Sequence, residues 1–139
     1  MKSTYIIGEI GQNHNGSVDI AKLLVELVAR PIHEELFQLD LKPMDAIKLT
    51  KRDLSEELSI SQMNRPYDSP HSFGKTYGEH RAFLELSDEE HFEVYKHAKK
   101  HGLDFVETLC AKGCLSLLKL FTLSTKPTTP TSHQPLSFS

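Results

Sequence analysis

The chain has 139 residues and a formal net charge of −3, which is enough length for one domain with a modest core and offers no strongly basic surface for nucleic acid. No apolar run approaches the ~20 residues of a membrane span. The first four residues lead directly into a strand-like run without the features of a signal peptide, so the sequence predicts a cytoplasmic protein.

Residues 5–10 predict a first strand that contains one carboxylate, Glu9. A polar loop follows, and then a helical pattern that begins after the N-cap residue Ser17 and ends near Arg30, because Pro31 disfavours helical geometry in the residue before it. In such strand–loop–helix units, chemistry is located at the carboxyl end of the strand. A carboxylate in an apolar strand must be paired, protonated or used. Because side chains alternate between the two faces of a strand, Glu9 can also simply face outward from a half-exposed strand. The spacing alone does not decide between this structural interpretation and a functional one.

The next segment is less regular. Residues 32–37 favour one or two helical turns, and residues 39–44 favour a connector. Residues 45–50 predict a second strand, within which Lys48 is an unusual residue. A lysine at this place either extends its amine to water or protects a sheet edge, or it takes part in a site.

A long polar loop is predicted over residues 64–81. Loops of this length are usually functional or disordered, and the aromatic residues Tyr67 and Tyr77 argue against disorder. Its cations Lys75 and Arg81 either face solvent or hold an anionic substrate.

The clearest helix begins after Ser87, which forms a capping box with Glu90, and ends at Gly102. The residues predicted to form its buried stripe are Phe92, Tyr95 and Ala98. The residues predicted to lie on the surface are His91, His97 and His101.

A third strand is predicted over residues 103–109, with Thr108 near its carboxyl end, and a third helix over residues 111–121. Cys110 and Cys114 lie about one helical turn apart. With no second pair of cysteines to complete a metal site, they are expected to be reduced thiols.

The last residues, 122–139, consist largely of serine, threonine and proline. Such a composition does not bury a core and predicts an unstructured tail. The alternative is that the chain leaves its proper reading near Leu120, through a frameshift or an incorrect end.

Two motifs resemble the N-acetylneuraminate (sialic acid) synthase family. Residues 7–16, with the sequence IGEIGQNHNG, resemble the opening motif of that family, and residues 65–80, which contain RPY and GKTYGEH, resemble a later loop. The resemblance covers roughly residues 4–120. It implies an α/β fold, namely a partial (β/α)8 TIM barrel of about the first three β/α units over residues 1–121, with a disordered C-terminal tail over residues 122–139. The chain therefore looks truncated.

The family condenses phosphoenolpyruvate with an N-acyl hexosamine, such as N-acetylmannosamine, to give a sialic acid and phosphate. By resemblance, Glu9 is catalytic and contacts the sugar near its reacting carbon, whereas Lys48 and Thr108 bind phosphoenolpyruvate. Lys75 and Arg81 are the candidates for further substrate contacts. The family usually has a proline after the hydroxyl residue, where this chain has Leu109.

The resemblance also implies a divalent metal, Mn²⁺ or Mg²⁺, that polarises the sugar aldehyde. In the family its histidine ligands come from later strands, so the ligands are not expected in this chain. Family members are homodimers, and an open sheet fragment is expected to self-associate and to be inactive. The alternative is a non-catalytic fragment, or an interaction module that uses an open sheet edge. Neither nucleic acid nor a membrane is expected as a partner.

Overall fold

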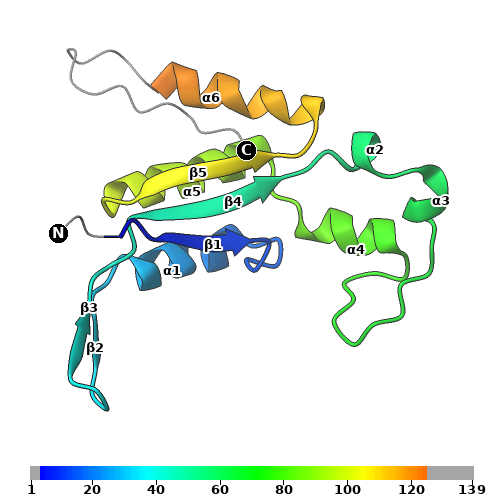
Figure 1. Cartoon of the computed structure of the whole chain (residues 1–139). Helices are drawn as coiled ribbons and strands as arrows, with labels where there is room; N and C mark the ends of the chain where they lie inside the picture. Colours follow the sequence, from blue (N-terminus) through cyan, green and yellow to red (C-terminus); the bar gives the residue numbers. More distant parts are fainter. Residues whose placement is uncertain (1–3, 125–139) are drawn as a thin grey trace.

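A computed structural model describes residues 4–124, in which three parallel strands form one sheet in the order β1-β4-β5. The strands are β1 (Ile7–Gly11), β4 (Ala46–Lys51) and β5 (Asp104–Leu109). They are neighbours in the order in which they follow one another along the chain, and all three point the same way in Figure 1. The three predicted strands and their parallel arrangement are confirmed.

The core of the protein lies on one face of this sheet. Helices α1 (Val18–Val28) and α5 (Asp88–Lys100) pack against each other and cover that face (Figure 1). The buried apolar residues that join sheet and helices are Ile10, Ala21, Val25, Ile47, Leu49, Leu86, Val94, Ala98 and Leu103. Each helix within residues 4–124 is too short or too polar to cross a bilayer.

Between the first helix and the second strand of the sheet, the chain forms a small antiparallel hairpin, β2 (Ile32–Glu34) and β3 (Leu39–Leu41), which extends away from the sheet (Figure 1). The helical turns and connector predicted here are therefore wrong. The Glu34 carboxylate accepts hydrogen bonds from two backbone amides of the turn. Gln38 has a φ of 51°, in the left-handed region, which breaks any helix.

The segment after β4 holds three short helices, α2 (Leu54–Glu57), α3 (Ile60–Met63) and α4 (Tyr77–Leu84). The predicted loop over residues 64–81 is thus wrong at its end, where α4 begins. Thr76 caps α4 and forms a capping box with Glu79. Capping residues, rather than apolar residues at helical spacing, mark these helices in the sequence. They were not predicted because helices were recognised mainly by that apolar spacing.

Helix α5 begins as predicted, with Ser87 and Glu90 in a capping box. Its buried face is shifted by one position from the prediction for its first two members: the buried residues of the helix are His91, Val94 and Ala98. His91 is 1% exposed, so the prediction that it is a surface residue is wrong. Phe92 and Tyr95 instead contact each other and the ring of Phe121, on α6 (Leu117–Ser124).

After β5 the chain forms a 3₁₀ turn, η1 (Lys112–Ser116), and then α6, which packs against α5. The helix predicted over residues 111–121 is present but begins as a 3₁₀ helix and continues to residue 124. The predicted tail over residues 122–139 lies, from residue 125 onward, outside the described residues. Cys110 and Cys114 are free thiols, and burial raises the pKa of both.

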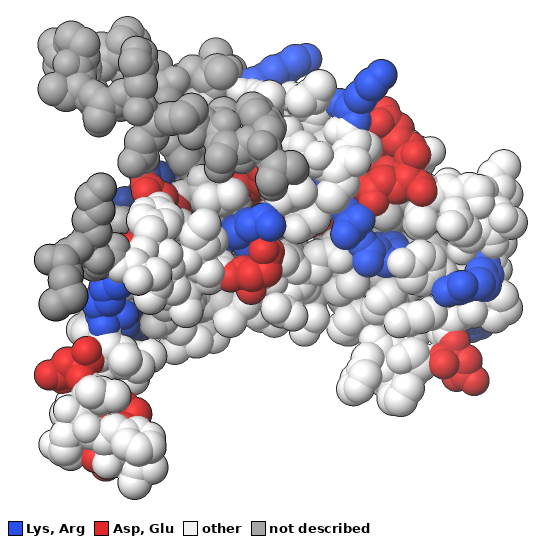
Figure 2. All heavy atoms as spheres, in the orientation of Figure 1, with Lys and Arg blue, Asp and Glu red and all other residues white. Residues whose placement is uncertain are grey.

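The face of the molecule seen in Figure 2 carries cations and anions side by side, with white surface between them. This distribution agrees with the small net charge of −3.

Candidate functional site

Glu9 and Lys48 lie side by side on the sheet face opposite the helices. Ile47 and Leu49 are fully buried in the helix-side core. Because side chains alternate along a strand, Lys48 between them faces the other way. The register places Glu9 beside Lys48, and the Lys48 amine contacts the Glu9 carboxylate at 3.1 Å. Glu9 therefore has a partner, and since β4 is the central strand, Lys48 does not protect a sheet edge.

This ion pair remains accessible to a ligand. The Lys48 side chain is 30% exposed and that of Glu9 54%. Pairs with this exposure contribute under about 1 kcal/mol to stability. Their value for folding is small, and both groups can exchange partners with a bound molecule.

Thr108 lies on the same face as the pair, nearer the carboxyl end of the sheet. Lys48 is in register with Val106, and Thr50 is in register with Thr108. At ~3.3 Å per residue, Thr108 is about 7 Å farther along the strand direction than the Lys48 row. The structure thus brings Glu9, Lys48 and Thr108, one residue from each strand, to the same face of the sheet. Thr50 lies beside Thr108, so two threonine hydroxyls follow the ion pair toward the carboxyl end.

Two basic residues, Lys51 and Arg52, mark the carboxyl end of β4. Lys51 lies 3.5 Å from a carboxylate oxygen of Asp88. Arg52 donates to Glu57 at 2.7 Å, and its backbone amide donates to Glu85 at 3.2 Å. Among the described residues, Arg52 Nε is a buried donor without a hydrogen-bond partner. Burial raises the pKa of the Glu85 carboxyl.

Arg81 and Lys75, the two cations predicted in the long loop, lie farther from the sheet than Glu9 and Lys48. Arg81, on α4, has its guanidinium 6.0 Å from the centre of the Tyr77 ring, and its charge opposes the rise in the pKa of Glu85. Lys75 is exposed in the loop before α4. This part of the chain lies beyond the carboxyl ends of the strands (Figure 1).

The helix side of the same sheet holds a buried polar group that the sequence analysis missed. The His91 ring contacts the Glu107 carboxylate at 3.1 Å, and the two side chains are 1% and 9% exposed. Burial raises the pKa of Glu107, and the contact with His91 opposes that rise. His91 Nε2 and Glu107 Oε1 are buried without hydrogen-bond partners in the described part of the chain. Glu107 offered a usable signal, because it is a second carboxylate inside an apolar strand.

His14, in the loop after β1, belongs to the same buried layer. It is 1% exposed, and its Nδ1 accepts a hydrogen bond from the Gly16 amide at 3.1 Å. Burial, followed by repulsion from His91, lowers the pKa of His14 to about 4. The loop of the first motif is therefore built around a neutral imidazole.

A parallel sheet with its helices on one face and polar residues at its carboxyl end defines the chain as a β/α-repeat protein of the kind found in enzymes. The curated proteins that the chain resembles are named as enzymes of one kind. The chain is 34% identical over 116 residues to N-acetylneuraminate-9-phosphate synthase of Drosophila melanogaster, covering 84% of this chain and 28% of the relative. It is 36% identical over 101 residues to the human protein of the same name, covering 73% of this chain and 25% of the relative.

A solved structure shares the fold. It is the N-acetylneuraminic acid (sialic acid) synthetase from Leptospira borgpetersenii serovar Hardjo-bovis, in complex with citrate, with a TM-score of 0.56 and 19% identity, covering 85% of this chain and 33% of that chain. No family model matches the sequence. The chain belongs to the N-acetylneuraminate (sialic acid) synthase family, as the two motifs indicated, and spans about a quarter of the length of the curated relatives it matches.

Proposed function

We propose that residues 1–121 supply the first three β/α units of a TIM barrel in a synthase that condenses phosphoenolpyruvate with an N-acyl hexosamine. Two features support the barrel. The strands pair in chain order, and their helices cover a single face, as in a barrel rather than a sheet wound on both faces. The two outer strands, β1 and β5, each have one neighbour within the described sheet, which leaves an edge for a further strand.

The proposal assigns the two substrates to the open face of the sheet. The observation that carries it is the contact of 3.1 Å between Lys48 and Glu9, on the face that a barrel would turn inward. Lys48 and Thr108 donate hydrogen bonds to phosphoenolpyruvate, and the lysine adds charge. Glu9, beside Lys48, faces the reacting carbon of the sugar. Arg81 and Lys75 extend the positive potential beyond the strand ends, where an anionic substrate enters.

Within residues 4–124, this face offers no complete ligand set for the divalent metal of the family. Among residues 4–124, the group of three candidate metal ligands that the structure brings together is Glu26, His97 and His101, on the helices. The residues at the open face therefore do not fit a Mn²⁺ or Mg²⁺ site by themselves, and no step through the metal is derived for this chain.

The isolated chain is expected to be inactive and to self-associate. Tyr5, Ile6 and Ile7 are 55%, 40% and 48% exposed near the edge strand β1. Exposed apolar groups beside an unpaired edge favour association. The same feature favours the second candidate, an interaction module in which another chain adds a strand to this edge.

The experiment that separates these functions is Glu9→Gln in a full-length protein that contains this segment. The change keeps the shape of the side chain and removes its charge and its capacity for proton transfer. Because general acid–base help is typically worth ~10²–10⁴-fold, turnover should fall at least ~10²-fold, with the melting temperature and phosphoenolpyruvate affinity little changed.

Glu93→Gln is the matched control. Glu93 is paired with Lys22 on the helical surface, at 2.8 Å, and its replacement should leave turnover intact. If turnover survives Glu9→Gln, the catalytic role of Glu9 is wrong. If phosphate release from the 139-residue chain alone requires both phosphoenolpyruvate and N-acetylmannosamine, the expected inactivity is wrong.

A further inference from the structure

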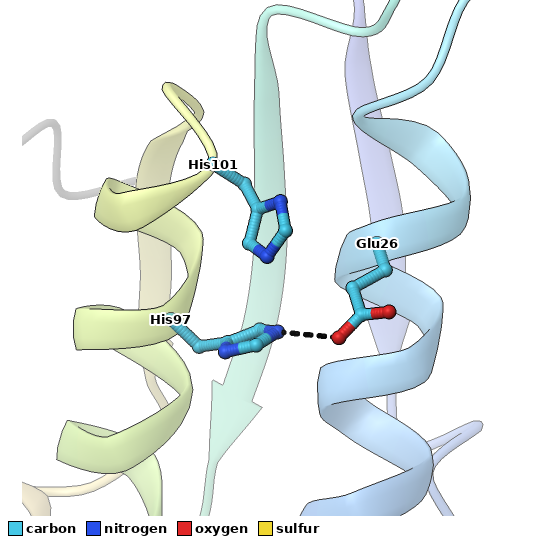
Figure 3. Close-up of side chains that lie close together, drawn as sticks. All are labelled: Glu26, His97 and His101. Carbon is cyan, nitrogen blue, oxygen red and sulfur yellow. Dashed lines mark hydrogen bonds and ion pairs between the residues drawn. The ribbon is translucent and has the colours of Figure 1, made fainter.

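Three side chains converge on the outer surface between α1 and α5. His97 lies in the last turn of α5 and His101 is the C-cap residue of that helix, four positions later, so the two lie on the same side of the helix end. Glu26 approaches them from α1 (Figure 3). The His97 Nε2 atom lies 3.1 Å from Glu26 Oε1, and the two imidazole rings have their centres 4.6 Å apart. One ligand atom from each of the three residues lies within 4.8 Å of the others.

This spacing is close to that of a metal centre. Zinc binds imidazole nitrogen at ~2.0–2.1 Å and carboxylate oxygen at ~2.0–2.2 Å, so tetrahedral ligand atoms lie roughly 3.3–3.5 Å from one another. The 3.1 Å contact between His97 and Glu26 is slightly shorter than this spacing, so a small separation of the two side chains would admit the ion. His101 is exposed, and one of its ring nitrogens already lies within 4.8 Å of the ligand atoms of the other two residues.

We propose that Glu26, His97 and His101 bind a divalent transition metal ion of the Zn²⁺ class, with water completing the coordination. Two imidazoles and one carboxylate suit zinc, copper or nickel, whereas Mg²⁺ and Ca²⁺ prefer oxygen ligands alone. The site lies in the helical layer, across the sheet from the face that holds Glu9 and Lys48. It is thus independent of the proposed synthase chemistry.

The surrounding charges set the strength of this site. Arg30 lies 3.6 Å from the other oxygen of Glu26 and competes with a cation for that carboxylate. Lys100 and Lys96 line the adjoining groove with His97, whereas the charge of Lys22 is matched by Glu93. Imidazole binds metal through an unprotonated nitrogen, so the ion would replace the hydrogen through which His97 Nε2 contacts Glu26.

An ion held in this way would connect two successive β/α units. Glu26 belongs to the first unit and the two histidines to the helix that follows the second strand. Because a ligand that binds only the folded state stabilises it, zinc should raise the melting temperature of the chain.

The test uses the 139-residue chain after treatment with a chelator. Zn²⁺ is titrated and the melting temperature measured, with Mg²⁺ at the same concentration as the reference. The expected result is a saturable rise with Zn²⁺ at one equivalent and none with Mg²⁺. Co²⁺ provides a second readout, a visible absorption band of nitrogen and oxygen coordination. A sulfur-to-cobalt charge-transfer band would place the ion at Cys110 or Cys114 and overturn the proposal.

The variants assign the ligands. His101→Gln keeps the His97–Glu26 hydrogen bond and should weaken Zn²⁺ binding on the order of tenfold or more. Glu26→Gln and His97→Gln should do the same. The matched control is His33→Gln, because His33 also pairs with a carboxylate, at 2.8 Å from Asp40, but on the distant hairpin. Unchanged Zn²⁺ affinity in His101→Gln, or an equal loss in His33→Gln, would overturn the site.

Discussion

The buried His14 should make the stability of this chain depend on pH. Its folded-state pKa is about 4, against an ordinary value of 6.5. Between these two values the unfolded chain binds a proton that the folded chain does not. The stabilisation is therefore fully present above pH 6.5 and falls as the pH drops toward 4. Each pH unit within this window costs about 1.4 kcal/mol, so the full window is worth about 3 kcal/mol and the part down to pH 5 about 2 kcal/mol.

The assay is urea unfolding of the native chain and of His14→Asn at pH 7.5 and pH 5.0. The asparagine oxygen can replace the His14 Nδ1 acceptor that the Gly16 amide uses. The variant should lose about 2 kcal/mol less than the native chain over this interval, whatever its stability at pH 7.5. His71→Asn, a change at an exposed loop residue, serves as the control. Equal losses in the native chain and in His14→Asn would refute the argument, as would an NMR titration that finds His14 charged at pH 6.

Two further predictions concern packing. Leu49→Ala removes a fully buried side chain from the sheet–helix core and should cost about 2–5 kcal/mol in the free energy of unfolding, whereas Leu23→Ala, at a half-exposed helical residue, should cost far less. Gly16→Ala should lower stability by about 1–3 kcal/mol in the same urea assay, because Gly16 has a φ of 72° and a Cβ would collide with the Phe83 carbonyl oxygen. A free energy of unfolding unchanged by Gly16→Ala would contradict this prediction and show that the loop and α4 separate readily.

The sequence predicted the elements whose signals are local and strong. The Ser17 and Ser87 caps, the strand around Glu9 and the break before Pro31 are set by a few adjacent residues, and the structure agrees with each. The hairpin after α1 was missed because its signal is a left-handed backbone at Gln38, a residue with no special preference for it. The helices α2 and α3 were also missed, because each is a single turn that is marked in the sequence only by its capping residue.

The candidate site divides in a similar way. Glu9, Lys48 and Thr108 were predicted from the family resemblance together with their places near strand ends, and parallel pairing brings them to one face. The ion pair between Glu9 and Lys48 depends on register, which no local pattern contains. His91 was placed on the surface because the aromatic residues beside it on α5 look like a buried stripe. The carboxylate that contacts the His91 ring belongs to Glu107 on β5, 16 residues away in the chain, so no local pattern around His91 indicates it.

The pairing of β1 with β4 has a consequence for how the sheet avoids misassembly. A slip of one residue would turn Lys48 toward the helices and expose Ile47 and Leu49. It would also separate the Lys48 amine from Glu9, its neighbour in the native register. The Glu9–Lys48 pair on one face of the sheet and the buried Ile47 and Leu49 on the other are thus both lost if the register slips by one residue. The native register is therefore the one that both buries the apolar row and pairs Glu9 with Lys48, and the apolar row contributes most of that preference.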